Sequence, residues 1–281
     1  MDLNQAIKFA QLLNAAYAVN PSDLANAAGQ SISAGGATYT VVTTIYANDL
    51  ATEMNPLRSA NIVSIGLVLQ VAGAADVVIA IRGTEGILEW IQDAKFVAVP
   101  CPFLPGAGNT EDGFSDMYSS LRTGSGGGSP TVVSVLAKLS FPQPVDAATP
   151  VTICGHSLGG ALVTLLALDI AANTIFKNPT VYTYASPRVG DGAFAVMYNH
   201  LVSNTFRIAN RVDIVPKLPM PPLYDHALGL HEINPVLLLP MPPKILVKPT
   251  IACEHILGTY LHLLSMAAGG PALPLDAMCI P

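Results

Sequence analysis

The sequence has 281 residues, of which 51% are hydrophobic and only 11% are charged, with a formal net charge of −6. Proteins average roughly 25% charged residues. The low charge of this chain is explained either by a large buried core or by an exposed apolar surface that contacts an apolar substrate or interface. A negative net charge gives no basis for nucleic-acid binding, which requires a basic stripe. The longest apolar stretch, residues 158–172, is interrupted by Asp169 and is shorter than the about 20 residues of a bilayer span, so we expect no transmembrane segment.

The length allows one large domain or two of ordinary size. No internal stretch has the composition of a linker, so we expect one domain over residues 1–281. The first twenty residues lack a basic segment before an apolar run, so we expect either a cytoplasmic chain or a secreted one whose leader is absent from this sequence. Their apolar side chains recur at helical spacing and predict an amphipathic helix: Ile7, Ala10, Leu13 and Tyr17.

Runs typical of strands and runs typical of helices alternate from residue 62 onward, which predicts an α/β layered fold. Two β-branched runs separated by a short turn predict a hairpin over residues 62–72 and 77–82. Further strands are expected at residues 150–154, 181–186 and 206–209. Helices are expected at residues 113–121 and 131–139, and from Leu158 onward.

The segment from Ile214 to Thr250 carries nine prolines among mostly apolar residues. Proline removes a backbone donor and clashes with the preceding helical turn, so regular helix is excluded there. We expect irregular structure that covers one end of the sheet. Residues 235–243 within it are too apolar for an ordinary solvent loop, so the proline- and leucine-rich piece 214–247 can help to line an apolar trough.

Residues 152–160 contain the pattern G-x-S-x-G between a β-branched strand and a long apolar helix. This is the context in which the pattern forms a sharp turn that exposes a serine hydroxyl. Gly155 and Gly159 have no Cβ, so the turn can close tightly around Ser157. We therefore predict that Ser157 is a nucleophile, the alternative being a chance turn of small residues.

Five segments resemble, in the same order, those of the fungal-type lipases known as class 3 lipases. They are residues 81–93, 113–121, 155–170, 181–191 and 206–219. The resemblance implies an α/β-hydrolase fold, with a mostly parallel central sheet flanked by helices and a short helical lid. It also implies a serine carboxylic-ester hydrolase, most simply a triacylglycerol lipase, whose partner is a lipid or other ester at a lipid–water interface.

The acid that orients the base follows the nucleophile along the chain in this fold. Asp213 comes a few residues after the strand expected at 206–209 and matches the family's aspartate in its Asp-Ile-Val-Pro segment. We predict that Asp213 is this acid, the alternative being a turn-capping aspartate. The other carboxylates after Ser157 are Asp169, Asp191, Asp225, Glu232, Glu254 and Asp276.

Four histidines follow Asp213, and His255 is the predicted base. His255 begins a segment similar to the family's C-terminal one, in which a Tyr-Leu pair follows five residues later. The family often has an acidic residue where this chain has Gly258, which weakens the match. The alternatives are His226, which resembles a structural histidine of the family, and His262, which lies two helical turns after His255 and is more typical of a helix face.

An oxyanion hole needs two N–H donors aimed at one point. One is expected from the backbone of Leu158, directly after the nucleophile. The resemblance implies that Thr84, which follows Arg82 and Gly83 at the end of an expected strand, supplies the other. Arg82 is expected to brace this loop rather than to touch substrate.

Residues 85–95 predict a short amphipathic helix with Ile87, Leu88, Trp90 and Ile91 on its apolar side. Such a helix ordinarily packs on the core. The family uses this segment as a lid with a tryptophan at the matching position, and Trp90 is the only tryptophan of the chain. The resemblance therefore implies a lid.

Several alternatives stay open from the sequence: a phospholipase A1, a feruloyl-type esterase, an acyltransferase with the same triad, or a catalytically inactive fold-mate that binds lipid. No metal or organic cofactor is expected. The four cysteines form no C-x-x-C pair, which argues against structural zinc. Cys154 is expected to be a buried thiol, whereas the state of Cys101, Cys253 and Cys279 is open, although Cys253 and Cys279 could close a loop.

Overall fold

The computed structural model describes residues 1–18, 27–48, 61–83, 96–126, 128–238 and 246–281. In this part of the chain, one sheet has the strand order β1-β2-β3-β4-β7-β8-β9-β10. The first four strands pair antiparallel, and β4 and the strands beyond it pair parallel. The strands are β1 (Ser31–Ala34), β2 (Ala37–Asn48), β3 (Ile62–Val71), β4 (Val77–Ile81), β7 (Val151–His156), β8 (Thr180–Tyr184), β9 (Thr205–Asn210) and β10 (Leu230–Ile233).

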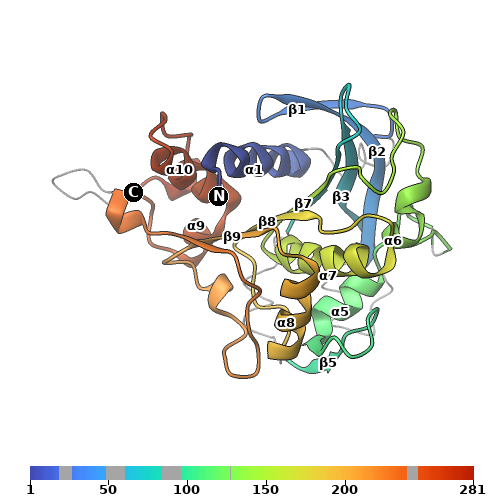
Figure 1. The fold of residues 1–281 in the computed structure, drawn as a ribbon. Coiled ribbons are helices and arrows are strands. Elements are labelled where there is room, and N and C mark those ends of the chain that lie inside the picture. Colours follow the sequence, from blue (N-terminus) through green and yellow to red (C-terminus); the bar gives the residue numbers. More distant parts are fainter. Residues whose placement is uncertain (19–26, 49–60, 84–95, 127, 239–245) are drawn as a thin grey trace.

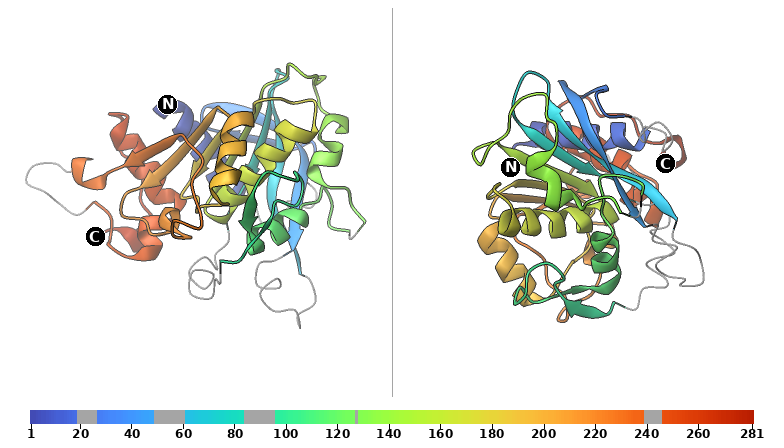
Figure 2. Two further views of the ribbon diagram at one scale, coloured as in Figure 1. Left: turned by 60° about the horizontal axis from the view of Figure 1, so that its bottom comes forward. Right: turned by 90° about the vertical axis from the view of Figure 1, so that its right-hand side faces the viewer.

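Helices cover both faces of this sheet (Figures 1 and 2). One face is covered by α1 (Leu3–Ala18) and α10 (Leu257–Ala267), which pack against each other. The other is covered by α5 (Asp112–Ser119), α7 (Leu158–Asn173) and α8 (Gly192–Leu201). Two buried apolar clusters result, one on each face of the sheet, which accounts for much of the high hydrophobic content.

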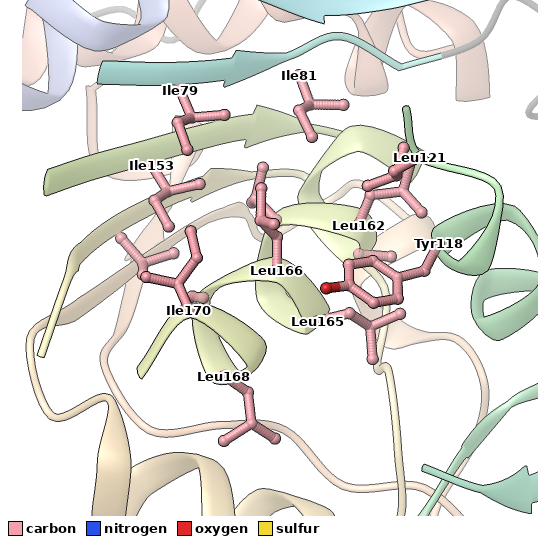
Figure 3. Packing of buried hydrophobic residues seen from close by; sticks show 14 of the residues in the cluster. Ile79, Ile81, Tyr118, Leu121, Ile153, Leu162, Leu165, Leu166, Leu168 and Ile170 are labelled. Atoms are coloured by element: carbon pink, nitrogen blue, oxygen red, sulfur yellow. The ribbon is translucent and has the colours of Figure 1, made fainter. Parts of the chain in front are cut away.

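The larger apolar cluster lies between the central strands and α7, as Figure 3 shows. Ile79 of β4 and Ile153 of β7 lie over Leu166 of α7, and all three are fully buried. The buried Asp169 of this helix accepts a hydrogen bond from the Tyr118 hydroxyl (2.5 Å) and one from Asn173 (2.7 Å). These partners offset the cost of a carboxylate inside an apolar helix.

The elements predicted from the sequence that fall within the described residues are confirmed, with boundaries shifted by a few residues, whereas the short helix expected over residues 85–95 lies outside them. The amphipathic N-terminal helix is α1, and the hairpin is the antiparallel pair β3 and β4. The helix expected at 131–139 consists of the short α6 (Val132–Val135) followed by a 3-10 turn.

The prediction of purely irregular structure from Ile214 to Thr250 is wrong at β10, which pairs parallel with β9 and extends the edge of the sheet. Only four residues long, β10 contains none of the segment's prolines and so keeps the donors that the ladder needs. The sequence patterns did not predict β1, β2, a small ribbon of β5 (Ala98–Pro100) and β6 (Asn109–Glu111), α8 or α9 (Ile251–His255). The helix implied around His262 is α10, which begins at Leu257, so a break after His255 separates the two histidines. None of the helices in the described residues has the length and apolar character needed to span a membrane.

Candidate active site

The turn between β7 and α7 holds Ser157 in an uncommon backbone conformation, with φ 58° and ψ −127°. Residues other than glycine adopt positive φ rarely, and such positions concentrate at functional sites. The flanking glycines are required by space. A Cβ on Gly155 would lie 2.3 Å from the carbonyl oxygen of Gly159, and one on Gly159 would lie 2.3 Å from that of Ile81. The two glycines of G-x-S-x-G are therefore required because any side chain at either position would clash with the backbone of this turn.

The structure brings the three predicted side chains of the triad together. Ser157 Oγ lies 2.8 Å from His255 Nε2, and His255 Nδ1 lies 2.9 Å from Asp213 Oδ2. A carboxylate can only accept, so Nδ1 carries the proton that it donates to Asp213, and Nε2 is left to accept from the serine hydroxyl. All three residues are buried. Ser157 lies at the end of β7, Asp213 follows β9, and His255 ends α9.

Two further groups fix the carboxylate of Asp213. The Tyr260 hydroxyl donates to Oδ2 (2.8 Å), and the backbone N–H of Val215 donates to Oδ1 (2.9 Å). Burial and the charge of Asp213 raise the pKa of Tyr260 well above its ordinary value, so the hydroxyl keeps its proton. Tyr260 in turn accepts a hydrogen bond from the backbone N–H of Asn210 (2.9 Å), which ties α10 to the end of β9.

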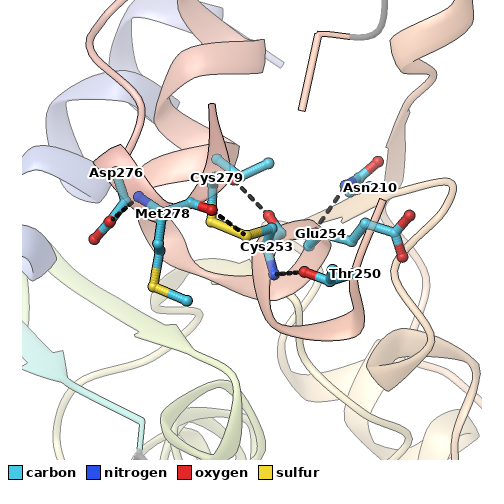
Figure 4. Close-up of a disulfide and its surroundings, with 8 residues drawn as sticks. Asn210, Thr250, Cys253, Glu254, Asp276, Met278 and Cys279 are labelled. Atoms are coloured by element: carbon cyan, nitrogen blue, oxygen red, sulfur yellow. Dashed lines mark hydrogen bonds between the residues drawn. A yellow bond between two sulfur atoms is a disulfide. The ribbon is translucent and has the colours of Figure 1, made fainter. Parts of the chain in front are cut away.

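A disulfide holds the short helix that carries His255. Cys253 in α9 is bonded to Cys279 near the C-terminus (Figure 4), whereas Cys101 and Cys154 are free, buried thiols. The side chain of Thr250 accepts from the N–H of Cys253 (3.2 Å) and caps the start of α9. The segment that carries His255, the predicted base, is thus anchored covalently two residues before the histidine.

Removal of this disulfide, by replacing both Cys253 and Cys279 with serine, is expected to lower the free energy of unfolding by about 3–4 kcal/mol, because it closes a loop of 26 residues in the unfolded chain. Activity should fall as well, since α9 loses its anchor. Denaturant unfolding and ester hydrolysis, each with and without reductant, measure both effects. Reductant should lower the free energy of unfolding and the activity of the wild-type protein, and should change neither quantity in the double variant. An equal response of the two proteins would contradict the role of the disulfide.

The competing histidines and carboxylates have other partners. His226 Nε2 contacts the carbonyl oxygen of Pro216 (2.7 Å), and burial, followed by the charge of Arg207, lowers the pKa of His226 to about 3. His262 Nδ1 contacts the carbonyl oxygen of Leu273 (2.6 Å). Asp191 accepts from the N–H of Phe194 (2.9 Å) and caps α8. These residues serve the fold of their own segments.

Leu158, one predicted oxyanion donor, is the first residue of α7 and is buried. The first N–H groups of a helix have no partner within it and lie at its positive end, so this position suits developing negative charge. Arg82 donates from Nε and Nη2 to the carbonyl oxygen of Ser64 (3.3 and 3.0 Å), as a bracing role requires. Thr84 and the predicted lid, residues 85–95 with Ile87, Leu88, Trp90 and Ile91, lie outside the described residues.

Some residues at the site were not predicted from the sequence. Tyr260 was noted only as part of the Tyr-Leu pair, and its contact with Asp213 was not expected. His156 occupies a variable position of G-x-S-x-G, so the pattern gives no signal that this side chain is buried against His255. In the described residues, no group of three or more potential ligands is arranged to hold a metal ion.

Comparisons with known proteins identify the family of this chain. The sequence profile of the family Lipase (class 3) matches residues 78–222. Phospholipase A1-II 6 of Oryza sativa subsp. japonica is 34% identical over 226 residues, which cover 71% of this chain and 53% of that protein. The chain thus spans about half the length of the curated relatives that it matches.

Solved structures show the same fold. A Rhizomucor miehei lipase propeptide complex superposes with a TM-score of 0.63 at 24% identity, over 83% of this chain and 67% of that chain. The structure of the Rhizomucor miehei triacylglyceride lipase superposes with a TM-score of 0.50 at 31% identity, over 60% of this chain and 61% of that chain. The predicted α/β-hydrolase fold is confirmed, and the chain belongs to the class 3 lipase family.

Proposed function

We propose that this protein is a serine carboxylic-ester hydrolase that acts on lipid esters through Ser157, His255 and Asp213. The observation that carries the proposal is the series of hydrogen bonds from Ser157 Oγ through His255 to Asp213. A general base must lie within hydrogen-bond reach of the proton that it removes, and 2.8 Å meets this condition. A buried carboxylate behind the imidazole stabilises the imidazolium that forms.

The reaction follows from these positions. Ser157 Oγ attacks the ester carbonyl carbon while its proton passes to His255 Nε2, and the carbonyl oxygen becomes an oxyanion beside the N–H of Leu158. His255 then protonates the alcohol oxygen as its bond to carbon breaks, which leaves the acyl group on Ser157. A water molecule repeats the sequence, releases the carboxylic acid and restores the serine.

Exposed apolar side chains beside the triad support a lipid substrate, and within this class we propose triacylglycerol. Val212 and Ile214, on either side of Asp213, are 42% and 36% exposed, and Ile251 at the start of α9 is 49% exposed. Isolated exposed apolar residues are ordinary on protein surfaces. Here, two of them are the sequence neighbours of Asp213, and the third lies on the short helix that ends in His255. An uncharged lipid surface can bury them without desolvating a charge.

A phospholipase A1 activity is the second candidate, because the rice protein named phospholipase A1-II 6 aligns with 71% of this chain. Initial rates on trioctanoin emulsion, phosphatidylcholine vesicles, p-nitrophenyl butyrate and methyl ferulate separate the alternatives. The triacylglycerol proposal expects the highest kcat/KM on trioctanoin. A higher value on phosphatidylcholine would transfer the proposal to phospholipids, and hydrolysis of methyl ferulate alone would contradict a lipid substrate.

An inactive lipid-binding protein is the alternative from another class. A fluorophosphonate probe distinguishes it, because the probe bonds covalently to a serine only where a base activates the hydroxyl. We expect stoichiometric labelling at Ser157, located by peptide mass spectrometry, and no labelling after Ser157→Ala. Absence of labelling in the folded wild-type protein would contradict the proposed enzyme.

The lid proposal concerns Trp90 and its apolar neighbours, whose burial at a lipid surface would stabilise an open state by very roughly 1.5–3 kcal/mol per side chain. Trp90→Ser is expected to reduce hydrolysis of tributyrin emulsion several-fold more than hydrolysis of soluble p-nitrophenyl acetate, because only the emulsion requires opening at an interface. Both rates are measured on the same preparation. Equal losses on the two substrates would make the segment a fixed wall of the pocket.

The disulfide between Cys253 and Cys279 helps to choose between the two compartments expected from the sequence, the cytoplasm and the outside of the cell. Disulfides persist in oxidising compartments and are rare in the cytosol of mesophiles. We propose on this ground that the protein functions in an oxidising environment, which is tested by counting free thiols in protein isolated from its natural source. Two free thiols per chain are expected, whereas four would favour a reducing compartment.

A further inference from the structure

A partly buried series of hydrogen bonds connects the N-terminal helix to the backbone of the predicted base. Gly83, which follows β4, donates its N–H to the Tyr17 hydroxyl at 2.6 Å. That hydroxyl lies 2.9 Å from Nδ1 of His156, and Nε2 of His156 lies 2.9 Å from the carbonyl oxygen of His255. Tyr17 and His255 both lie outside the part of the chain that the family profile matches.

The two ends of this series determine the proton positions within it. The N–H of Gly83 can only donate, and the carbonyl oxygen of His255 can only accept. Nε2 of His156 must therefore carry a proton. Burial, followed by the proximity of His255, lowers the pKa of His156 to about 3, so the ring is neutral and Nδ1 accepts from Tyr17. Each group then donates in one direction, from Gly83 towards His255.

The helix that ends in His255 needs this support. α9 has five residues, too few for a helix to be stable without tertiary contacts. The last carbonyl groups of a helix have no partner within it, and three of them in α9 are bound by side chains from other segments. Thr259 donates to Cys253 (2.6 Å), Asn210 donates to Glu254 (2.9 Å) and His156 donates to His255 (2.9 Å).

The other end of the series lies directly against the nucleophile. A Cβ on Gly83 would lie 2.8 Å from the Tyr17 hydroxyl oxygen and 2.9 Å from Cβ of Ser157. The Tyr17 hydroxyl thus contacts Gly83, at the end of β4, where the chain enters the predicted oxyanion loop. His156, which directly precedes Ser157, binds the backbone of His255. A shift of Tyr17 would change these three segments relative to one another.

We propose that Tyr17 and His156 are positioning residues, which hold the backbone of His255 and the segment at Gly83 in register with Ser157. The proposal rests on the proposed ester hydrolysis at Ser157. The N-terminal helix α1 is then part of the machinery that aligns the base, in addition to covering the sheet. Both side chains act through the geometry between His255 Nε2 and Ser157 Oγ.

Three variants test the proposal on soluble p-nitrophenyl butyrate. Tyr17→Phe removes the hydroxyl, His156→Leu removes the donor to His255, and His156→Gln keeps an N–H near the position of Nε2. Displacement of a catalytic group by about 1 Å can cost about 100-fold, so we expect Tyr17→Phe and His156→Leu to lower kcat by about 10- to 100-fold with KM unchanged. His156→Gln should recover part of the loss.

The combination of Tyr17→Phe with His156→Leu should lower kcat no further than the worse single variant, since both break one series. Tyr198→Phe is the matched control: it removes a buried hydroxyl on α8 that contacts Thr205 (3.0 Å), and should lower Tm with kcat retained. Loss of Tm without loss of kcat in the Tyr17 and His156 variants would overturn the proposal, as would additive losses in the double variant.

A measurement that does not depend on activity separates this inference from the proposed function. Imidazole ¹⁵N NMR of the wild-type protein should show His156 as the neutral Nε2–H tautomer without titration between about pH 5 and 9. A proton on Nδ1, or a titration in this range, would overturn the series of hydrogen bonds whether or not the enzyme is active. An inactive wild-type protein with the expected tautomer would instead contradict only the proposed ester hydrolysis.

Discussion

Ser157→Ala is expected to lower kcat on p-nitrophenyl butyrate by about 10⁴- to 10⁶-fold, the range observed when a member of a catalytic triad is removed. The loss of Oγ leaves no atom to form the acyl-enzyme. The fold should be retained, because the smaller alanine side chain fits the same turn and Gly155 and Gly159 keep the space that the turn needs. Circular dichroism and Tm check the fold, and substantial turnover by the folded variant would rule out Ser157 as the nucleophile.

His255→Ala should be as damaging as Ser157→Ala, and the double variant should be no worse, because the two side chains act as one unit. His226→Ala is the matched control, since His226 is half-buried and contacts the carbonyl oxygen of Pro216 instead of the triad. The control is expected to lose stability and keep most of its kcat. An inactive His226→Ala protein with normal Tm would show that the base has been assigned to the wrong histidine.

Asp213→Asn is the third substitution with a very large expected effect, a fall in kcat of about 10⁴-fold with little change in KM. The amide keeps the shape of the side chain but cannot stabilise the imidazolium of His255. It also presents an N–H towards the Tyr260 hydroxyl or His255 Nδ1, both of which donate to Oδ2 in the native protein. The substitution therefore disturbs the tautomer of the base as well as its charge.

Asp169→Asn provides the control for the loss of a buried carboxylate. Asp169 is buried in α7 and accepts from the Tyr118 hydroxyl, so its replacement should lower Tm while kcat is retained. Steady-state kinetics of the two variants at one pH give the comparison. An Asp213→Asn protein that turns over at the wild-type rate would direct attention to Glu232 or Asp225 as the acid.

The sequence determined the features that depend on neighbouring residues. The turn at Ser157 follows from the glycines two residues before and after it, because each occupies a place where a Cβ would meet a backbone oxygen at 2.3 Å. The strand before it and the helix after it follow from continuous apolar runs. Asp213 and His255 were identified by their order after Ser157 and by resemblance to a family with the same segments.

The distant residues that support these three could not be predicted from local patterns, because packing brings them together. Tyr17 and His156 are 139 residues apart in the sequence, and the apolar pattern that predicted α1 treated Tyr17 as part of a buried face. The pairing of Cys253 with Cys279 and the contact of Tyr260 with Asp213 likewise depend on how α9, α10 and the end of β9 pack. A local pattern restricts the backbone of its own segment, whereas a hydrogen bond between segments forms only where packing of the whole sheet and its helices brings a donor to an acceptor.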